Sequence, residues 1–431
     1  MSQGFPYADR RSVRERVAIL DHFVAWAFIV LGVDLIGCGP FGVQVGGLSI
    51  RYALWGIVAL LSFGVEWKSR SERRQFCAFA VFMGLLVSVW GVIVPVARGV
   101  DLTSSLRECR PLLAFPVFIA AQAAARVFGA RKLLRIFALM SIAPAVAISV
   151  AWSARVLLGD DSIALALKNW LQNSGEWKSG VFIGPMPSGE YRVMWIVVMF
   201  FPLAILASAG RRLWWLWSGI FLLASVASNT RAVFLTALLA IVASVALRFR
   251  FRLLTTISCI LVVGASLVHF VPETRLIDFG DTLDSGDPRM EQARSLLLAW
   301  ASTPLLGLGF GGEAEVVRSE LAPFSYELTY LALFSKVGLI GSLILSCWAL
   351  SQLQAVMRLP GCARAMALVA VVCFLAITST NPYLLNLFGL WLLMGLLAIL
   401  HGGLREAGYV PGHSATTSAT GFPKLAAITR R

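Results

Sequence analysis

Charged side chains are scarce in this sequence, and their scarcity excludes an ordinary soluble protein. Asp, Glu, Lys and Arg make up 14% of the 431 residues, whereas hydrophobic residues make up 58%. Soluble globular domains carry roughly 25% charged residues. Apolar runs of about 20 residues recur along the chain, and such a run can cross the roughly 30 Å hydrocarbon core of a bilayer. Together with a mean hydropathy of +0.78, this predicts an all-α polytopic membrane protein.

Residues that bind metals are also few. The four histidines are scattered, and most of the seven cysteines lie inside apolar runs, where Cys behaves as a small buried hydrophobe. No Cys and His spacing typical of a zinc site is present. We therefore expect no metal and no other cofactor.

The apolar runs predict about twelve membrane-spanning helices in a single transmembrane domain, residues 1–402. The first run is followed by many others, so we do not interpret it as a cleaved signal peptide. Residues 403–431 form a polar tail rich in Ser, Thr and Ala, for which we expect a cytoplasmic location and disorder. The predicted spans are 17–38, 48–66, 75–97, 111–129, 133–157, 191–209, 213–228, 230–248, 253–271, 327–351, 363–380 and 384–402.

Basic residues gather in every second connection between these spans. Lys and Arg mark the cytoplasmic side of membrane proteins, so the pattern predicts that both termini lie on the cytoplasmic side of the membrane. The same asymmetry accounts for the formal net charge of +14 without a nucleic acid partner. The basic connections hold Arg10, Arg11, Arg14 and Arg16; Lys68, Arg70, Arg73 and Arg74; Arg126, Arg131, Lys132 and Arg135; Arg211 and Arg212; Arg248, Arg250 and Arg252; Arg358 and Arg364; and Arg405, Lys424, Arg430 and Arg431.

The opposite, periplasmic face then collects two long loops, residues 158–190 and residues 272–326. The second joins the ninth and tenth spans and lies within the one long polar interruption of the chain, Val271–Gly341. Loops of this length between packed elements are usually functional. We therefore expect the active site on the outward face.

The outward face also carries arginines that the charge rule does not predict. Arg192 and Arg231 lie at the mouths of apolar spans, where an unpaired guanidinium is costly. Arg binds phosphate through a planar, bidentate fork, which favours a pocket for an anionic, diphosphate-like headgroup. The alternative is that these arginines pair with outward acids such as Asp101, Glu108 and Glu190, or with lipid phosphates. The set comprises Arg51, Arg98, Arg107, Arg110, Arg155, Arg192, Arg231, Arg275, Arg289, Arg294 and Arg318.

The large loop contains a glycine-rich segment that is not a nucleotide site. Residues 287–312 predict an amphipathic helix broken by Pro304 and then by the sequence GLGFGG, Gly307–Gly312. No Lys-Ser/Thr pair follows these glycines, as a phosphate-binding loop requires. The segment is also predicted to face outward, away from ATP.

Three short motifs occur in order and resemble the O-antigen ligase and Wzy polymerase superfamily of membrane glycosyltransferases. The first, SNTR, starts one span; the second is an Arg-led helix that ends in PLLGLG; the third, TYLALFSKVGLIG, re-enters the membrane after the large loop. The resemblance covers roughly residues 195–400. The matching residues are Ser228, Asn229, Thr230 and Arg231; Arg289 and Pro304–Gly309; and Tyr330, Leu331, Gly338 and Gly341.

The third motif departs from the family at its start. Glu327 and Leu328 stand where the family has His and Asn, and in the ligases that His is expected to assist deprotonation of the acceptor hydroxyl. The departure favours an exopolysaccharide polymerase, of the xanthan type, over a lipid A ligase. The closing segment Thr378–Leu393 is also similar to such polymerases.

The resemblance implies an inverting, metal-independent transfer of glycan between polyprenyl diphosphate carriers. Arg231 and Arg289 would stabilise the leaving diphosphate as negative charge develops, and Glu327 would act as general base. Glu327 as a simple ion-pair partner of an outward arginine is the alternative. His269 is the second candidate for the base.

Further residues are candidates for substrate binding, namely Arg192, Arg294, Tyr330 and Lys336. Lys336 lies within a span, so it is expected to pair with a carboxylate or with a carrier phosphate. The implied partners are a polyprenyl-diphosphate-linked oligosaccharide and membrane lipid; a chain-length regulator and export machinery are candidate protein partners.

Two other classes of function compete with glycan transfer. A lipid-linked oligosaccharide flippase would suit many spans with both termini inside, but carriers often show two similar halves and ionisable residues at mid-membrane. Here the polar residues concentrate in outward loops, and no duplication is visible. An accessory protein without an active site is the third reading. Within glycan transfer, an O-antigen ligase is the near alternative to a polymerase.

Overall fold

The computed structural model describes residues 10–37, 44–45, 48–63, 70–172, 181–185, 191–209, 212–249, 288–316, 326, 328–379, 384 and 386–406. In these ranges the chain is mostly helical, and 6 helices are long and apolar enough to cross a membrane. This agrees with a polytopic all-α membrane protein. The count of twelve spans and their orientation stay predictions, and the ninth predicted span, 253–271, lies outside the described residues.

The N-terminal half alternates long helices with short irregular turns. Its elements are α1 (Arg10–Gly37), β1 (Gln44–Val45), β2 (Leu48–Ser49), α2 (Ile50–Phe63), α3 (Arg70–Leu85), the π-helix η1 (Leu86–Ile93), α4 (Val94–Ala97), α5 (Leu102–Cys109), the 3-10 helix η2 (Arg110–Ala114), α6 (Val117–Phe128), α7 (Ala130–Leu158) and α8 (Ser162–Gln172).

The C-terminal half begins with a β-hairpin and is otherwise helical where it is described. Its elements are β3 (Val181–Pro185), β4 (Tyr191–Trp195), the 3-10 helix η3 (Ile196–Phe200), α9 (Phe201–Ser208), α10 (Trp214–Ala227), α11 (Arg231–Phe249), α13 (Pro288–Ser302), α14 (Thr329–Met357), α15 (Gly361–Ser379) and α16 (Leu387–Glu406).

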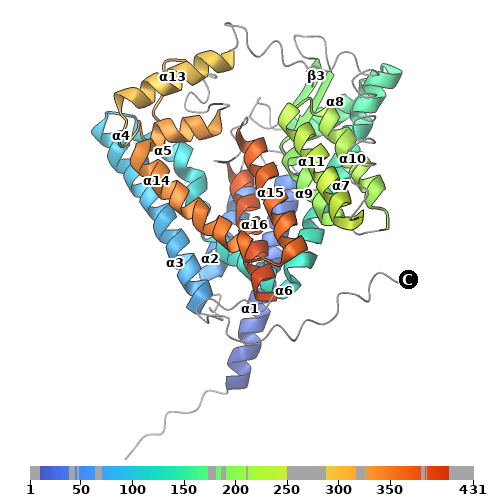
Figure 1. Ribbon diagram of the computed structural model, residues 1–431, viewed down its shortest axis with the longest axis horizontal. Helices are drawn as coiled ribbons and strands as arrows, with labels where there is room; N and C mark the ends of the chain where they lie inside the picture. Colours follow the sequence, from blue (N-terminus) through green and yellow to red (C-terminus); the bar gives the residue numbers. More distant parts are fainter. Residues whose placement is uncertain are drawn as a thin grey trace, which may run out of the picture.

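Two groups of helices flank a central pair. In Figure 1, α15 and α16 lie between a group made of α3, α4, α5 and α14 and a group made of α7 to α11. Helix α13 lies at the same end of the molecule as α8 and β3, on the opposite side, and α1 extends beyond the other helices at the other end. The described elements within the two predicted outward loops therefore lie at one end.

The two short helices at that end begin at acidic caps. The carboxylate of Asp101 accepts hydrogen bonds from the backbone N–H groups of Thr103 and Ser104, at 3.2 and 2.9 Å, and starts α5. Asp160 accepts from the N–H of Ser162 at 2.8 Å and starts α8. These bonds satisfy donors that a helix start leaves open, and the bond from Ser104 is the main cause that lowers the pKa of Asp101.

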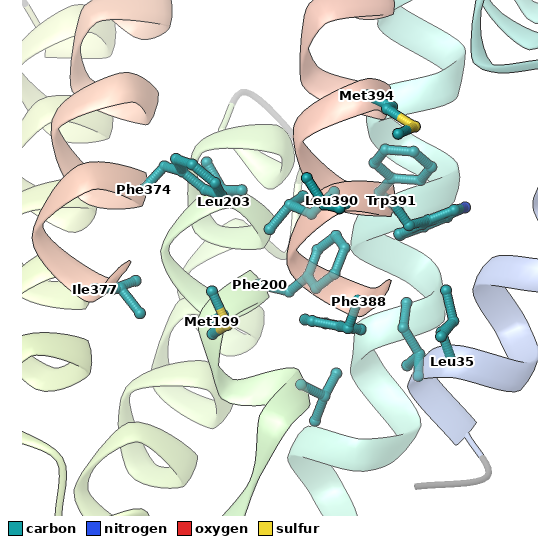
Figure 2. Close-up of a cluster of buried hydrophobic side chains, with 14 of the residues drawn as sticks. Leu35, Met199, Phe200, Leu203, Phe374, Ile377, Phe388, Leu390, Trp391 and Met394 are labelled. Atoms are coloured by element: carbon teal, nitrogen blue, oxygen red, sulfur yellow. The ribbon is translucent and has the colours of Figure 1, made fainter. Parts of the chain in front are cut away.

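Aromatic rings fill the centre of the core (Figure 2). The ring of Trp391 lies 5.2 Å from that of Phe28, 4.9 Å from Phe137 and 5.7 Å from Phe200, measured between centroids. A Cβ added to Gly32 would overlap the Trp391 ring, so the glycine leaves room on α1 for this side chain of α16. Small residues serve the same purpose at helix contacts in membranes, where packing rather than water exclusion joins helices.

The predicted span 191–209 is only partly helical. Its first residues form β4, which pairs with β3 in antiparallel register, Val181 opposite Trp195 and Pro185 opposite Tyr191. The apolar run 193–201 looks continuous in the sequence, but Val193 is β-branched and suits a strand as well as a helix. The helix α9 starts only at Phe201, after a 3-10 turn.

Candidate functional site

Helix α14 is broken at Gly338, and the break is filled by the segment that follows α13. Gly338 has φ 64° and ψ −166°, a conformation open essentially to glycine alone. Beyond the break, the N–H groups of Leu339 and Ile340 donate to the carbonyls of Pro304 and Leu305, at 2.9 and 3.1 Å. A helix break at membrane depth is tolerated when protein satisfies the freed backbone groups.

The glycine-rich segment Gly307–Gly312 completes this pairing. The N–H groups of Leu308 and Gly309 donate to the carbonyls of Ser335 and Lys336, at 3.0 and 2.9 Å. The same segment also contacts η1, because Phe310 donates its N–H to the carbonyl of Trp90 at 2.7 Å. The glycines are therefore needed for close backbone contact with α14 and η1.

Helix η1 offers carbonyls to its neighbours because of a proline. Pro95 has no N–H to give to the carbonyls four and five residues before it, those of Gly91 and Trp90. The carbonyl of Gly91 instead accepts from the Ser105 hydroxyl at 2.7 Å. The carbonyl of Trp90 accepts from Phe310, as described above. The wide turn of the π-helix thus joins α5 and the glycine-rich segment.

A buried ion pair lies where these elements meet. The Lys336 Nζ atom lies 2.5 Å from Glu108 Oε1 and 2.6 Å from Oε2, and the Gly311 N–H donates to Oε2 at 2.6 Å. The two side chains are 1% and 7% exposed. Buried charges persist in proteins when they are paired and hydrogen-bonded, and this carboxylate accepts from both an ammonium and a backbone donor. We call Glu108, Lys336 and Gly311 the buried latch.

Tyr326 packs beside the buried latch. Its ring centroid lies 5.7 Å from Lys336 Nζ, and its hydroxyl accepts a hydrogen bond from the Ala314 N–H at 2.7 Å. Tyr326 also packs with Leu296 of α13 and Ala332 of α14 in a small apolar cluster. Burial raises the pKa of Tyr326, so the phenol stays protonated and neutral near pH 7.

A second polar group lies between β4 and α11. Arg192 Nε donates to the Ser228 carbonyl at 2.8 Å, and Arg192 Nη2 donates to the Thr230 hydroxyl at 3.0 Å. Within this turn Asn229 has a positive φ of 45°, which Asn tolerates better than most residues. Arg231 follows as the first residue of α11 and is half-buried. We call Arg192 and residues 228–231 the arginine turn.

Helix α15 packs against both α14 and α11, the helices on which Lys336 and Arg231 lie. On one side, the Tyr330 hydroxyl of α14 and the Thr378 hydroxyl of α15 share a hydrogen bond of 2.6 Å. On the other, the Cys373 thiol of α15 donates to the carbonyl of Thr236 in α11 at 3.6 Å. The helices that begin at Arg231 and just before Tyr330 therefore both pack against one helix.

The predicted site residues take different places. The structure brings Arg192 and Arg231 into one turn, while Tyr330 and Lys336 lie on α14. Arg294 lies on the exposed side of α13, away from the buried residues that face α14.

Three other candidates cannot be placed in the same way. Arg289 is the second residue of α13, although its side chain is outside the described part. Glu327 and His269 lie outside the described residues.

The outward acids have partners other than those considered from the sequence. Asp101 caps α5 and Glu108 pairs with Lys336, while Glu190 is outside the described residues. Two outward arginines pair with different acids. Arg51 Nε lies 2.7 Å from Asp34 Oδ2, and Arg155 Nε lies 3.1 Å from Asp161 Oδ1.

Sequence reasoning missed the roles of Glu108 and Tyr326. A signal for the first was present, since Lys336 lies inside an apolar span and intramembrane lysines require a partner. Of the two carboxylates between Arg98 and Arg110, one carries the Asp-Leu-Thr-Ser pattern of a helix cap, which leaves Glu108. No comparable pattern singles out Tyr326.

Comparison with protein families gives one match. Residues 216–346 match the family model described as O-antigen ligase. The matched stretch starts in α10, contains Ser228–Arg231 and α13, and ends in α14 after Gly341. Comparison with curated proteins and with solved structures returned no match.

The match and the helices support the same class of protein. They support a multi-pass membrane protein related to the O-antigen ligase and Wzy superfamily, whose members act on lipid-linked oligosaccharides. They therefore also support glycan transfer of the ligase or polymerase type and a membrane glycosyltransferase-like enzyme. The matched stretch includes both the arginine turn's Arg231 and the Lys336 of the buried latch.

Proposed function

We propose that this protein polymerises polyprenyl-diphosphate-linked oligosaccharide repeat units into an extracellular or capsular polysaccharide, at the periplasmic face of the bacterial inner membrane. The observation that carries the proposal is the arginine turn, whose residues 228–231 lie within the stretch that matches the O-antigen ligase family. Arg192 holds this turn through hydrogen bonds to Ser228 and Thr230. Arg231 is the first residue of the 19-residue helix α11.

This arrangement suits a diphosphate group. The start of a helix carries unpaired N–H groups and a partial positive charge that favour anions, and the Arg231 guanidinium adds a full charge. The aromatic and apolar side chains of the spans suit the lipid part of a carrier. In the proposal Arg289 and Arg294 of α13 contribute further positive charge and Tyr330 completes the substrate-binding set, while Lys336, which the sequence made a further candidate, is enclosed with Glu108.

The reaction is a glycosyl transfer with inversion. A hydroxyl oxygen at the non-reducing end of the new repeat unit attacks the anomeric carbon of the growing chain. The bond from that carbon to the diphosphate oxygen breaks, and its electron pair stays on the diphosphate. Glu327 accepts the hydroxyl proton, and Arg231 with Arg289 stabilises the charge on the leaving group. The step uses no nucleotide sugar and no metal.

Polymerase is favoured over ligase by one residue. Glu327 occupies the position at which the ligases have a His.

The test uses purified protein and a synthetic polyprenyl-diphosphate repeat unit, without nucleotide. Wild type is expected to give a ladder of products on a gel. Arg231→Ala and Arg289→Ala are each expected to lower kcat by about 10²–10³-fold, as the loss of one stabilising donor does. Glu327→Gln is expected to lower it by about 10²–10⁴-fold. Arg212→Ala, at an exposed arginine on the predicted cytoplasmic side, is the matched control and should keep the ladder.

The alternatives give different products. A ligase would add one preformed chain to a separate acceptor and give a single new band. A flippase would move the lipid-linked unit across vesicles without any new glycosidic bond, and the arginine variants would leave elongation of already flipped units intact. Either result in place of a ladder would contradict the proposal.

A further inference from the structure

The buried latch lies directly beside the segment that contains the proposed base. Glu108 comes from α5, Gly311 from the glycine-rich segment and Lys336 from α14. These three elements are separate in the sequence and are joined at this point by the latch and by the backbone bonds around it. In Figure 1, α13 lies across the ends of α4, α5 and α14.

Backbone contacts alone already close the helix break. The carbonyls and N–H groups on both sides of Gly338 are paired with residues 304–309. Removing two charges from water costs several kcal/mol per ion in proteins, and a buried pair often contributes no more stability than apolar residues of similar volume. The backbone bonds therefore account for the helix break without the ion pair. The burial of two charges in the latch needs a separate explanation.

Tyr326 is a neighbour that contacts the Lys336 ammonium. The Lys336 ammonium lies over the Tyr326 ring, 5.7 Å from its centroid, a distance at which a cation attracts an aromatic face. The Ala314 N–H fixes the other end of the tyrosine through the hydroxyl, at 2.7 Å. Tyr326 is 2% exposed.

Leu328, the residue after the proposed base, is held by a backbone hydrogen bond. Leu328 is the cap of α14, and its carbonyl accepts the Ala332 N–H at 2.8 Å. Tyr326 and Leu328 flank Glu327 in the sequence. Both flanking residues are thus anchored to the same helix, one by its side chain and one by its backbone.

We infer that Glu108, Lys336 and Tyr326 are positioning residues, which hold the segment around residue 327 so that its carboxylate meets the acceptor hydroxyl. The inference rests on the proposed function, because that function gives Glu327 the role of base. In it, Lys336 acts through Tyr326 and need not leave Glu108 during the reaction. A misplacement of a catalytic group by about 1 Å can cost about 10²-fold in rate, so a positioning role has a measurable effect.

The experiment separates positioning from stability by comparing single and paired changes. Lys336→Met leaves the Glu108 carboxylate buried without its ammonium partner. Glu108→Gln together with Lys336→Met removes both charges but keeps an acceptor for the Gly311 N–H. Lys336→Arg keeps the charge. For each full-length, purified variant, the unfolding temperature is measured together with kcat and KM for the lipid-linked repeat unit.

The matched control is another buried ion pair. Arg126 Nη2 lies 3.2 Å from Asp21 Oδ1, with side chains 8% and 2% exposed. This pair joins α6 to α1 on the predicted cytoplasmic side. Arg126→Met alone, and Asp21→Asn with Arg126→Met, are expected to repeat the stability changes of the latch series while kcat of the folded protein stays at the wild-type value.

The expected result is a split between stability and rate. The single change Lys336→Met lowers both the unfolding temperature and kcat. The double change restores most of the unfolding temperature, because no charge remains unpaired, but kcat stays about 10-fold or more below wild type, with KM nearly unchanged. Lys336→Arg keeps most of kcat. Tyr326→Ala lowers kcat as the double change does, and Tyr326→Phe, which keeps the ring, lowers it less.

Two results would overturn the inference. If kcat returns to the wild-type value whenever the unfolding temperature does, the latch is only structural. If the double change raises KM and leaves kcat intact, Lys336 contacts the substrate itself.

A second readout does not depend on the reaction. Hydrogen–deuterium exchange of the peptide that covers residues 313–330 is expected to be faster in the double variant than in wild type, and unchanged in the control pair. Faster exchange together with a wild type that forms no polymer would mean that the latch holds the segment but the proposed function fails. Unchanged exchange would overturn the positioning role even if the polymer forms.

Discussion

The arginine turn and the buried latch are both polar groups in an apolar protein, and they treat charge in opposite ways. In the buried latch, Glu108 and Lys336 neutralise each other and are almost wholly enclosed. In the arginine turn, Arg192 donates to a carbonyl and a hydroxyl, and the adjacent Arg231 is half-buried.

The difference separates two tasks. A neutralised, enclosed pair has little field to offer an incoming anion, but it fixes the backbone groups around it. A half-buried group that carries two guanidinium side chains favours anions, and an anion loses less hydration there than in a fully buried site. We therefore assign recognition of the diphosphate to the arginine turn and the shaping of the site to the buried latch.

The largest expected effect on stability is at Gly338, where helix α14 is broken. Gly338→Ala places a Cβ 2.5 Å from the Leu305 carbonyl oxygen and forces alanine into a glycine conformation. The conformational strain alone is of order 1–3 kcal/mol, and the overlap with backbone adds to it. We expect a large fall in the unfolding temperature in a thermal unfolding assay. Gly219→Ala, where a Cβ meets open space, is the control, and an equal effect there would contradict this account of the break.

A smaller effect on stability is expected in the arginine turn. Arg192→Lys keeps the charge but loses the fork that reaches both Ser228 and Thr230. Hydrogen bonds from charged groups contribute about 1.5–3 kcal/mol, and the half-exposed position reduces this. We expect a modest fall in the unfolding temperature but a clear loss of kcat/KM, because the turn no longer holds Arg231. A variant with wild-type kcat/KM would show that charge at position 192 is sufficient.

The smallest effect is expected at the ion pair between Arg155 and Asp161. Like the buried latch it joins a basic and an acidic side chain, but it is exposed. Arg155 and Asp161 are 3.1 Å apart, but their side chains are 40% and 43% exposed. Exposed pairs contribute about 0–1 kcal/mol. Arg155→Gln should therefore leave both the unfolding temperature and kcat almost unchanged, in contrast to Lys336→Met. A loss comparable to that of Lys336→Met would show that enclosure does not decide the difference.

Two kinds of feature could be predicted from the sequence: the long apolar runs and the charged residues isolated within them. Long apolar runs predicted most helices to within several residues, and Lys336 inside a span predicted a partner. The strand β4 was not predicted, because it lies in an apolar run, and periodicity alone does not distinguish a short apolar strand from a helix. The break at Gly338 was not predicted either, since a glycine within an apolar run is common in membrane helices. Only the contact with Pro304 and Leu305 shows that the helix opens there.

The candidate site was predictable in part for a related reason. Arg192 and Arg231 stand out as charges at the mouths of spans, and the structure places them in one turn. The pairing of Glu108 with Lys336 joins residues 228 positions apart, and no local pattern specifies such a contact. Tyr326 is one of seven tyrosines and is distinguished only by its surroundings.

The measurement that tests the account most directly is binding of a short-chain polyprenyl diphosphate to the purified protein. It compares wild type, Arg231→Ala and the double variant Glu108→Gln with Lys336→Met, each first shown to be folded. The account predicts that Arg231→Ala weakens binding by about 10-fold or more, equivalent to about 1.4 kcal/mol, while the double variant binds as wild type does. Wild-type affinity in Arg231→Ala, or an equal loss in the double variant, would contradict the division between a turn that recognises the diphosphate and a latch that shapes the site.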